Sequence, residues 1–315
     1  MKKKGVVLAE LLMLPIGLFI VFFILAEGFG FHSIPIIISQ SMVPVVTGFG
    51  LFMMMNAGLM DFSMGARAVF AATIGGLMAE KLGIPGLILG CFLGAMFAAL
   101  VMALLYYLFK IPAMVISLGI LMIFEVAAAK LAGTSGYVKI TKAQYSIGSY
   151  PYNIILMLVA AVICYLVVYK MQIGCHITAV GNDEKMCGNL GIKPEKVKFQ
   201  AIMLTGVFCF FSALLTICYS GSITASTDMS TISMVSKPIM CVVLARYMRP
   251  KLDNMPFLIL YGGVCISIIF NGFIAMGFDD SVQDIVLGLF LIFVLGSRAI
   301  TGYVSEKRTV RAAVR

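Results

Sequence analysis

The sequence predicts an all-α polytopic membrane protein with about ten transmembrane helices, and three of its features support this fold class. The 315 residues are 61% hydrophobic and only 12% charged, about half the charged fraction of an average soluble domain. Apolar runs of about 20 residues, each long enough to span a bilayer as a helix, recur from end to end. A membrane β-barrel would show short alternating segments instead. The basic residues are unevenly distributed between alternate connections.

The expected helices follow from the apolar runs in chain order. The first run, after MKKKG, is too long for the apolar core of a signal peptide and has no cleavage site, so we expect a retained first helix. Gly75, Gly76, Gly90 and Gly94 are expected to let helices approach closely. The ten expected spans are residues 6–26, 34–55, 62–79, 85–108, 112–131, 153–169, 199–219, 232–247, 255–272 and 282–297.

The charge distribution predicts the orientation of these spans. With the N-terminus in the cytoplasm, 18 of the 23 Lys and Arg residues, Arg67 among them, fall in the loops and tails on the cytoplasmic side. This asymmetry favours cytoplasmic N- and C-termini and an even number of spans. The net charge of +9 therefore reflects orientation in a membrane, with lipid around the spans, and does not indicate a nucleic-acid partner. The remaining basic residues are Lys81, Lys130, Lys139 and Lys142 outside, and Lys237 just inside the outer end of a span.

The sequence offers no motif for catalysis or for a bound metal. The eight cysteines form no CxxC pair and there are only two histidines, so no metal site is expected. No GxxxxGK[ST] motif occurs, so the chain cannot bind ATP through a P-loop of its own. GxSxG and HExxH are also absent. We therefore expect a chain that is not an enzyme.

One long polar stretch interrupts the apolar pattern at residues 174–199, and it overlaps the connection 170–198 on the cytoplasmic side. Its sequence predicts a short helix, which could not be stable alone in water and so needs a partner: the membrane surface, its own spans or another protein. The signals are Asn182 as the cap, Asp183 and Glu184 in the first turn, Met186, Cys187 and Leu190 on one face, Gly191 as the terminator and Pro194 starting the next helix.

Few polar residues lie in or beside the spans. For Glu125 the alternatives are a structural hydrogen bond to a neighbouring helix and a place on a translocation path. For Asp61 the alternatives are a helix cap and a substrate contact. The candidates for such a path are Asn56, Asp61, Ser63, Ser117, Glu125 and Asn271.

Three segments in order resemble ribose-type, or monosaccharide, ABC importer permease subunits, in the branched-chain amino-acid/monosaccharide permease superfamily. They are GLMDFSMGARAVFAATIGG at 58–76, KIPAMVISLGILMIFEVAA at 110–128 and GCHITAVGNDEKMCGNLGI at 174–192. The resemblance implies a type II ABC importer-like permease fold, with residues 1–315 as one transmembrane domain. It also implies that spans 2–5 and 7–10 are inverted repeats.

The resemblance also implies partners and a location. The 170–198 loop would hold a coupling helix that docks on a P-loop ATPase, which uses ATP and Mg, while this chain binds no cofactor. An extracytoplasmic solute-binding protein, a second permease copy in a homodimer and the bacterial cytoplasmic (inner) membrane complete the expected setting. The residues that match the coupling pattern are Gly181, Asn182, Asp183, Glu184, Gly188 and Gly191.

The sequence departs from this family pattern in two places. Asn182 stands where the family usually has a second glycine, and 241–257 reads CVVLARYMRPKLDNMPF, with basic residues in place of glycines. The substrate assignment is therefore open between a monosaccharide, nucleosides and branched-chain amino acids. An alternative of another class is an ion-coupled secondary transporter that uses Glu125 and Lys237 as coupling groups.

Overall fold

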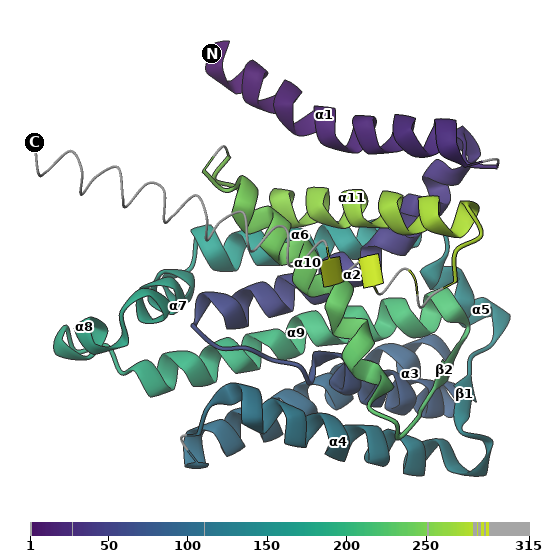
Figure 1. Cartoon of the computed structure of the whole chain (residues 1–315). Helices are drawn as coiled ribbons and strands as arrows, with labels where there is room; N and C mark the ends of the chain where they lie inside the picture. Colours follow the sequence, from purple (N-terminus) through teal and green to yellow (C-terminus); the bar gives the residue numbers. More distant parts are fainter. Residues whose placement is uncertain are drawn as a thin grey trace, which may run out of the picture. The chain divides into compact units, whose positions relative to one another are not determined.

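The computed structural model describes residues 2–26, 28–109, 111–250 and 252–279, together with five positions between 282 and 289. Across this part of the chain the structure is mostly helical (Figure 1), which confirms the all-α prediction. The elements are α1 (Lys2–Leu25), η1 (Phe31–Ser33), α2 (Ile34–Asn56), α3 (Met64–Phe109), α4 (Ala113–Ala132), η2 (Gly133–Ser135), β1 (Tyr137–Lys139), α5 (Lys142–Tyr145), η3 (Ser146–Gly148), α6 (Tyr152–Tyr169), α7 (Gln172–Asn182), α8 (Glu184–Asn189), α9 (Pro194–Ser220), β2 (Ser222–Thr224), η4 (Ser230–Ile232), α10 (Ser233–Met248) and α11 (Met255–Ala275).

Seven helical stretches among the described residues are long and apolar enough to cross a membrane. They coincide with the eight predicted spans from 34–55 to 255–272, because one of the seven stretches contains two of the predicted spans. Within the described side chains, Leu12–Leu25 of α1 form a further apolar helix. The predicted tenth span, 282–297, lies almost entirely outside the described residues.

The stretch that covers two predicted spans is α3, with 46 residues. A straight helix of that length would measure about 69 Å, more than twice the apolar thickness of a bilayer. The helix is instead broken at Gly83, whose φ of 66° and ψ of −143° are not helical. The two arms on either side of Gly83 correspond to the predicted spans 62–79 and 85–108.

Glycines allow these two arms to pack closely, as the sequence predicts. A Cβ atom at Gly90 would lie 2.7 Å from the Cα of Gly75, and one at Gly94 would lie 2.9 Å from the Cα of Ala71. Both neighbours are backbone atoms, which cannot rotate away as a side chain could. The contact between the arms therefore depends on the absence of side chains.

We expect Gly90→Leu to destabilise this pair of arms, because the added side chain must push the Gly75 backbone away at a cost of about 1–3 kcal/mol or more. The matched control is Gly119→Leu in α4, where a Cβ atom meets nothing within 4 Å. Thermal denaturation followed by size-exclusion chromatography in detergent would show a lower melting temperature for Gly90→Leu alone. Equal melting of both variants would contradict the packing argument.

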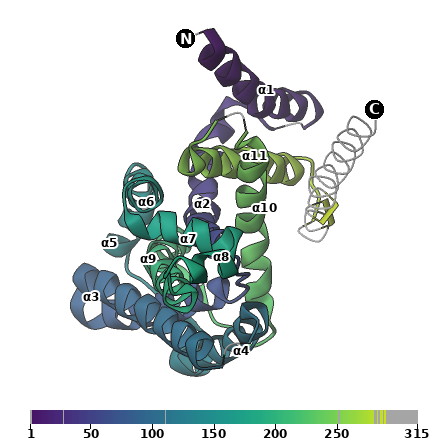
Figure 2. The ribbon, with the colours of Figure 1, turned by 90° about the vertical axis from the view of Figure 1, so that its left-hand side faces the viewer.

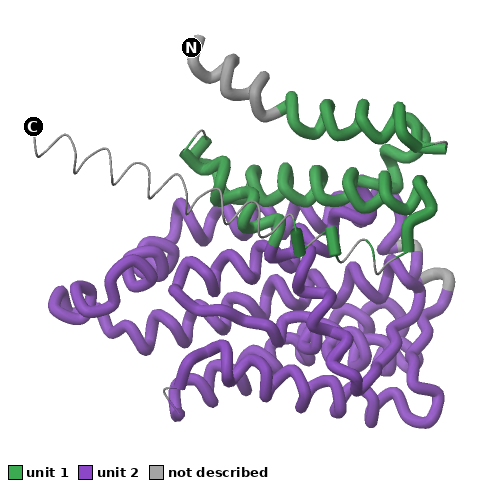
Figure 3. Tube along the Cα trace, viewed as in Figure 1, with its two compact units in different colours: residues 1–37, 240–315 green, residues 38–239 purple. Residues whose placement is uncertain are grey.

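The described chain forms two compact units, residues 1–37 with 240–315 and residues 38–239 (Figure 3). In the second unit, α9 is the most buried of the candidate spans, with 72% of its apolar window inside the protein. Figure 2 shows α9 between α3, α6 and α7, and all three contact it. The Thr47 and Ser212 hydroxyls, 2.7 Å apart, join α2 to α9. The central helix thus connects the elements that carry most of the candidate polar residues.

A short antiparallel ribbon closes one end of the second unit. Strand β1 pairs with β2 so that Val138 lies opposite Ile223. Val138 is buried and contacts Gly76 of α3, where a Cβ atom would lie 2.6 Å from its Cγ1. The ribbon therefore joins the connection after α4 to the connection after α9.

In the first unit, α1 packs against α11. The ring of Phe22 lies against Gly272, where a Cβ atom would approach it to 2.3 Å, and meets Phe273 edge-on at 5.5 Å. Phe29 and Ile268 join Phe22 in the same buried apolar cluster. The first apolar run of the sequence is therefore part of a packed helix.

Candidate functional site

The polar loop between α6 and α9 folds into two helices, α7 and α8, which meet at Asp183. Asp183 has extended backbone angles, and its side chain accepts a 2.9 Å hydrogen bond from the Met186 N–H. Asp183 is therefore the N-cap of α8, while Asn182 is the last residue of α7. The prediction of Asn182 as the cap was wrong by one residue, because both neighbours are good caps and the preceding helix continues through Asn182.

The apolar side chains of α8 divide between the inside and the outside of the protein. Cys187 is buried, whereas Met186 and Leu190 are 60% and 69% exposed. The prediction that all three share one apolar face is therefore wrong for Cys187, which packs inward. Met186 lies in α8 and Leu190, four positions later, is its C-cap residue, so the two side chains lie on the same side of the helix. That face is a small apolar surface without cover in the described residues.

Local contacts hold α8 in place at both ends. The Glu184 carboxylate accepts a 2.6 Å hydrogen bond from the Lys198 ammonium group on α9. At the other end, Gly191 has a φ of 81° and the Ile192 N–H donates to the Cys187 carbonyl at 3.1 Å, which ends the helix as predicted. Pro194 begins α9, also as predicted. The short helix is therefore fixed relative to a long span.

Helix α7 is docked on the end of α2. A Cβ atom at Gly181 would lie 1.8 Å from the carbonyl oxygen of Asn56, so only glycine fits at this approach. The Asn56 amide also donates a 3.0 Å hydrogen bond to the Thr178 hydroxyl. Gly181 and Asn56, predicted for different roles, thus form one contact.

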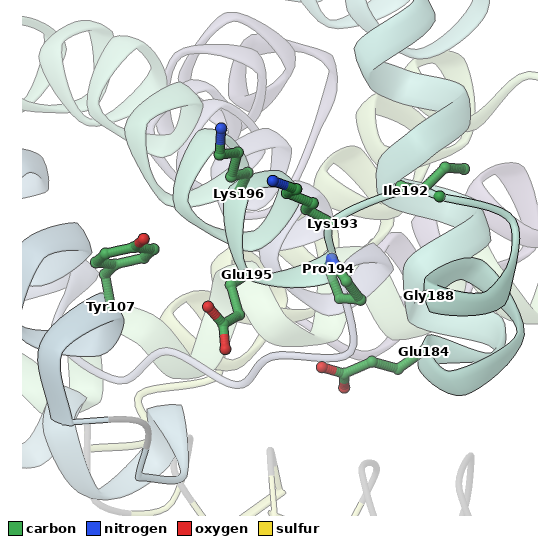
Figure 4. A pocket seen from close by; sticks show the side chains of 9 residues that line it. Tyr107, Glu184, Gly188, Ile192, Lys193, Pro194, Glu195 and Lys196 are labelled. Atoms are coloured by element: carbon green, nitrogen blue, oxygen red, sulfur yellow. The ribbon is translucent and has the colours of Figure 1, made fainter.

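A groove of about 540 Å³ opens beside α8 (Figure 4). In Figure 4 the Lys193 and Lys196 ammonium groups point away from the carboxylates of Glu184 and Glu195. The carboxylates of Glu184, which is paired with Lys198, and Glu195 therefore lie away from these two ammonium groups. The lining residues are Tyr107, Glu184, Gly188, Gly191, Ile192, Lys193, Pro194, Glu195 and Lys196.

A buried ion pair lies where the chain enters α3. Asp61 accepts hydrogen bonds from the Ser63 N–H at 2.8 Å and the Ser63 hydroxyl at 2.7 Å, directly before α3 begins at Met64. Its second carboxylate oxygen pairs with Arg67, which also donates to the Thr205 hydroxyl at 3.1 Å. Both charged side chains are fully buried. Placing Arg67 among the cytoplasmic loop charges was therefore wrong, because it lies in α3 and neutralises Asp61.

The other path candidates are also engaged with the protein. The Ser117 hydroxyl accepts from the Phe62 N–H at 3.2 Å and donates to the Met114 carbonyl at 2.8 Å. The Asn271 amide donates to the Ser267 carbonyl at 2.8 Å. Asn271 belongs to the first compact unit, whereas the other five candidates belong to the second.

Glu125 anchors a segment that the sequence reasoning did not include in the site. Its carboxylate accepts hydrogen bonds from the Met229 N–H at 2.9 Å, the Thr231 N–H at 3.0 Å and the Thr231 hydroxyl at 2.5 Å. These contacts correspond to the first alternative for Glu125, a structural hydrogen bond to a neighbouring part of the protein. The available signal was the run TASTDMSTIS at 224–233, which is rich in hydroxyl groups in a chain that is mostly apolar.

Comparisons with known proteins agree with this architecture. Residues 33–295 match the family described as branched-chain amino acid transport system / permease component. Two proteins described as autoinducer 2 import system permease protein LsrD, from Photorhabdus luminescens and from Photorhabdus laumondii, are each 25% identical over 276 residues, covering 80% of this chain and 78% of theirs.

A solved structure supports the fold. It is described as an inward-facing conformation of a metal-chelate type ABC transporter, and it aligns with a TM-score of 0.55 at 14% identity. The alignment covers 93% of this chain and 99% of that one. At this identity the likeness concerns the arrangement of helices alone.

Proposed function

The chain belongs to the family of permease components of branched-chain amino acid transport systems, and from that premise we propose that it forms the translocation path for a monosaccharide. It is the permease component of an ABC importer and a multi-pass protein of the inner membrane. The cargo named for its two relatives, autoinducer 2, supports a small hydroxylated solute over a branched-chain amino acid. Nucleosides remain the alternative cargo for the same machine.

The proposal of an ATP-driven importer is supported mainly by the exposed apolar face of α8. Met186 and Leu190 are presented on a short helix that is capped, terminated by Gly191 and tied to α9 through Glu184. Exposed apolar side chains on a helix fixed in this way favour a docking surface for another protein. In an ABC importer this partner would be the P-loop ATPase, which binds ATP and Mg and drives the cycle.

The groove beside α8 supports the same partner. It is lined by Glu184 and Gly188 of α8 and by Gly191 just after this helix, so it provides a recess beside the proposed docking helix. The coupling residues of the proposal are Gly181, Asp183, Glu184, Gly188 and Gly191, with Asn182 at the end of α7. The residues of α8 and its ends would shape this surface, Gly181 and Asn182 would hold α7 against the end of α2, and none would carry out chemistry.

The remaining parts of the proposed machine follow from the sequence. The charge distribution supports ten crossings with both termini in the cytoplasm, including the segment 282–297 outside the described residues. We place a second copy of the chain beside the first, and a solute-binding protein on the extracytoplasmic side over the β1–β2 ribbon. An ion-coupled transporter is not favoured, because the Glu125 carboxylate is committed to three donors in the second unit.

A double substitution in α8 tests ATPase docking. We expect Met186→Gln with Leu190→Gln to weaken ATPase binding by roughly tenfold or more, because each buried apolar side chain contributes about 1.5–3 kcal/mol. Glutamine keeps the helix propensity, and Asp183 is left intact because its loss would unfold the cap. The measurement is co-purification of the ATPase with tagged chain from native membranes in mild detergent.

Met171→Gln is the matched control, since Met171 is an exposed methionine of the same loop that lies outside α8. It should co-purify with as much ATPase as the wild type. If the double variant retained the ATPase as well as this control does, α8 would not be the docking helix. If no ATPase accompanied the wild type, the proposed energisation would be refuted.

A further inference from the structure

The segment 224–233 is the most hydroxylated stretch of the chain. Six of its ten residues are Ser or Thr, and Asp228 adds a carboxylate, in a chain that is 61% hydrophobic. We call residues Ser226–Ser233 the hydroxyl arch. The arch joins β2 to α10, and it contains Met229, a non-glycine residue with a left-handed φ of 57°. Its conformation is therefore imposed by the protein around it.

Two contacts place the arch at the depth of the apolar spans. Thr231 is bonded to Glu125, which lies seven residues before Ala132, the end of α4, a distance of about 10 Å along a helix. The Thr231 carbonyl oxygen also contacts the first turn of α3, where a Cβ atom at Gly65 would approach it to 2.4 Å. Gly65 is separated from the break at Gly83 by about 27 Å of helix. The arch therefore enters the bundle and does not lie above it.

Glu125 holds the arch from one side and leaves the other side open. Thr231, which donates two of the three hydrogen bonds to Glu125, is buried, whereas Thr227, Asp228, Ser230 and Ser233 are exposed. The Ser226 and Ser230 hydroxyls lie 2.5 Å apart, and the Ser233 hydroxyl donates to the Ser230 carbonyl at 2.7 Å. The arch thus presents a fixed row of polar groups on its exposed side.

Polar groups exposed at this depth do not face hydrocarbon. A hydroxyl or carboxylate in the apolar part of a bilayer loses its hydrogen bonds with water, so such groups line a water-filled space or meet another protein. A cavity of about 450 Å³ lies between Thr227 and the last turns of α4, with Lys130 and Thr134 on its wall. This volume falls within the range of sites for small molecules, about 300–1,000 Å³. Through Thr227, the arch therefore borders an open recess at the end of α4.

We propose that the hydroxyl arch lines the translocation path and exchanges hydrogen bonds with a polyhydroxylated cargo as it passes, with Glu125 as the residue that positions the arch. This inference deepens the proposed function and rests on it. A hydroxyl group both donates and accepts, so a row of them can replace water around a sugar in many orientations. Such contacts favour passage over tight binding. The buried Asp61, Ser63 and Ser117 act as structural supports in this arrangement.

Cysteine accessibility tests the arch directly. Ser230→Cys and Ser233→Cys would be introduced separately into the full transporter, with its ATPase, in right-side-out membrane vesicles. The probe is sulfonatoethyl methanethiosulfonate, a charged reagent that reacts with thiols in contact with water. We expect both variants to react, and the rate to differ by roughly tenfold between the nucleotide-free and the vanadate-trapped transporter, which equals a shift of about 1.4 kcal/mol between path states. Reaction at Ser230→Cys should also block solute uptake.

Two further variants calibrate the labelling. Leu89→Cys lies on the exposed apolar surface of α3 and should stay unreactive in lipid, whereas Tyr150→Cys, in an exposed loop, should react equally in both states. Wild-type chain gives the background from Cys175, the exposed native cysteine among those described.

The outcomes separate the arch from the transporter function. If both arch variants stayed unreactive while Tyr150→Cys reacted, the arch would face another protein surface, such as the second copy, and the proposal would be overturned. Equal rates in the two nucleotide states would also overturn it. ATP-dependent uptake of labelled pentoses and hexoses by the wild type is measured in the same vesicles. Its absence would count against the proposed function, while the reactivity in either state would still report whether the arch meets water.

Discussion

Asp61→Asn is expected to remove most of the folded protein from the membrane. The substitution leaves the Arg67 guanidinium fully buried without its counter-charge, because the carboxylate of Asp61 is its ion-pair partner and both side chains are inaccessible to water. Breaking one side of a buried pair costs about 3–5 kcal/mol, a large part of the stability of a typical domain. Fluorescence-detected size-exclusion chromatography of a tagged chain should show little monodisperse protein and a lower melting temperature.

The double variant Asp61→Asn with Arg67→Met is the matched control. It removes both charges, and the amide can still accept the hydrogen bond from the Ser63 N–H, so we expect most of the stability to return. Ser63→Ala, which removes a neutral hydrogen bond worth about 1 kcal/mol, should have a much smaller effect. A single Asp61→Asn variant that melts like the wild type would show that the ion pair contributes little to stability.

The span positions could be predicted because hydropathy measures the property that places a helix in a membrane. The apolar runs 34–55 and 153–169 differ by only a residue or so from α2 and α6. The break in α3 was harder, since Gly83 interrupts the helix through its backbone angles and not through polarity. Residue type shows where such a break is possible but does not show which glycine makes it.

The polar contacts were predicted less completely, for two physical reasons. Arg67 was counted as a loop charge because the sequence does not show that it pairs with Asp61. These two residues are six positions apart, and an irregular turn brings them together. The bonds from Glu125 to Thr231 join residues 106 positions apart, so no local pattern reports them. Local signals were more informative: Gly191 and Pro194 act as expected, and the cap of α8 was misplaced by one residue between two adjacent good caps.

Gly181→Ala is expected to stop transport while the ATPase remains bound. The added methyl group would lie 1.8 Å from the Asn56 carbonyl oxygen and 3.1 Å from the Gly58 nitrogen, both backbone atoms, so α7 must move away from the end of α2. The bond between Asn56 and Thr178 would be stretched by the same movement. Helix α8 keeps its own cap and its pair with Lys198, so its docking surface should survive.

The consequence follows from the position of this contact in the proposed machine. Movement of α8 can reach the spans by two connections, through α9 and through the contact of α7 with the turn between α2 and α3. This turn is followed by Asp61 and by the first turn of α3, which contacts the hydroxyl arch. Loosening the second connection should reduce ATP-driven uptake by roughly tenfold or more, the effect of about 1.4 kcal/mol, while ATP hydrolysis continues. Uptake and hydrolysis measured in the same proteoliposomes give the coupling ratio.

Cys175→Leu provides the comparison, because it enlarges an exposed side chain of the same helix without touching the end of α2. It should leave the ratio of solute transported to ATP hydrolysed unchanged. If Gly181→Ala kept the wild-type ratio, the contact between Gly181 and Asn56 would be only a packing feature, and coupling would run through α9 alone. If the variant instead lost its ATPase, α7 would be part of the docking surface, and the separation between a docking helix α8 and a transmitting helix α7 would be wrong.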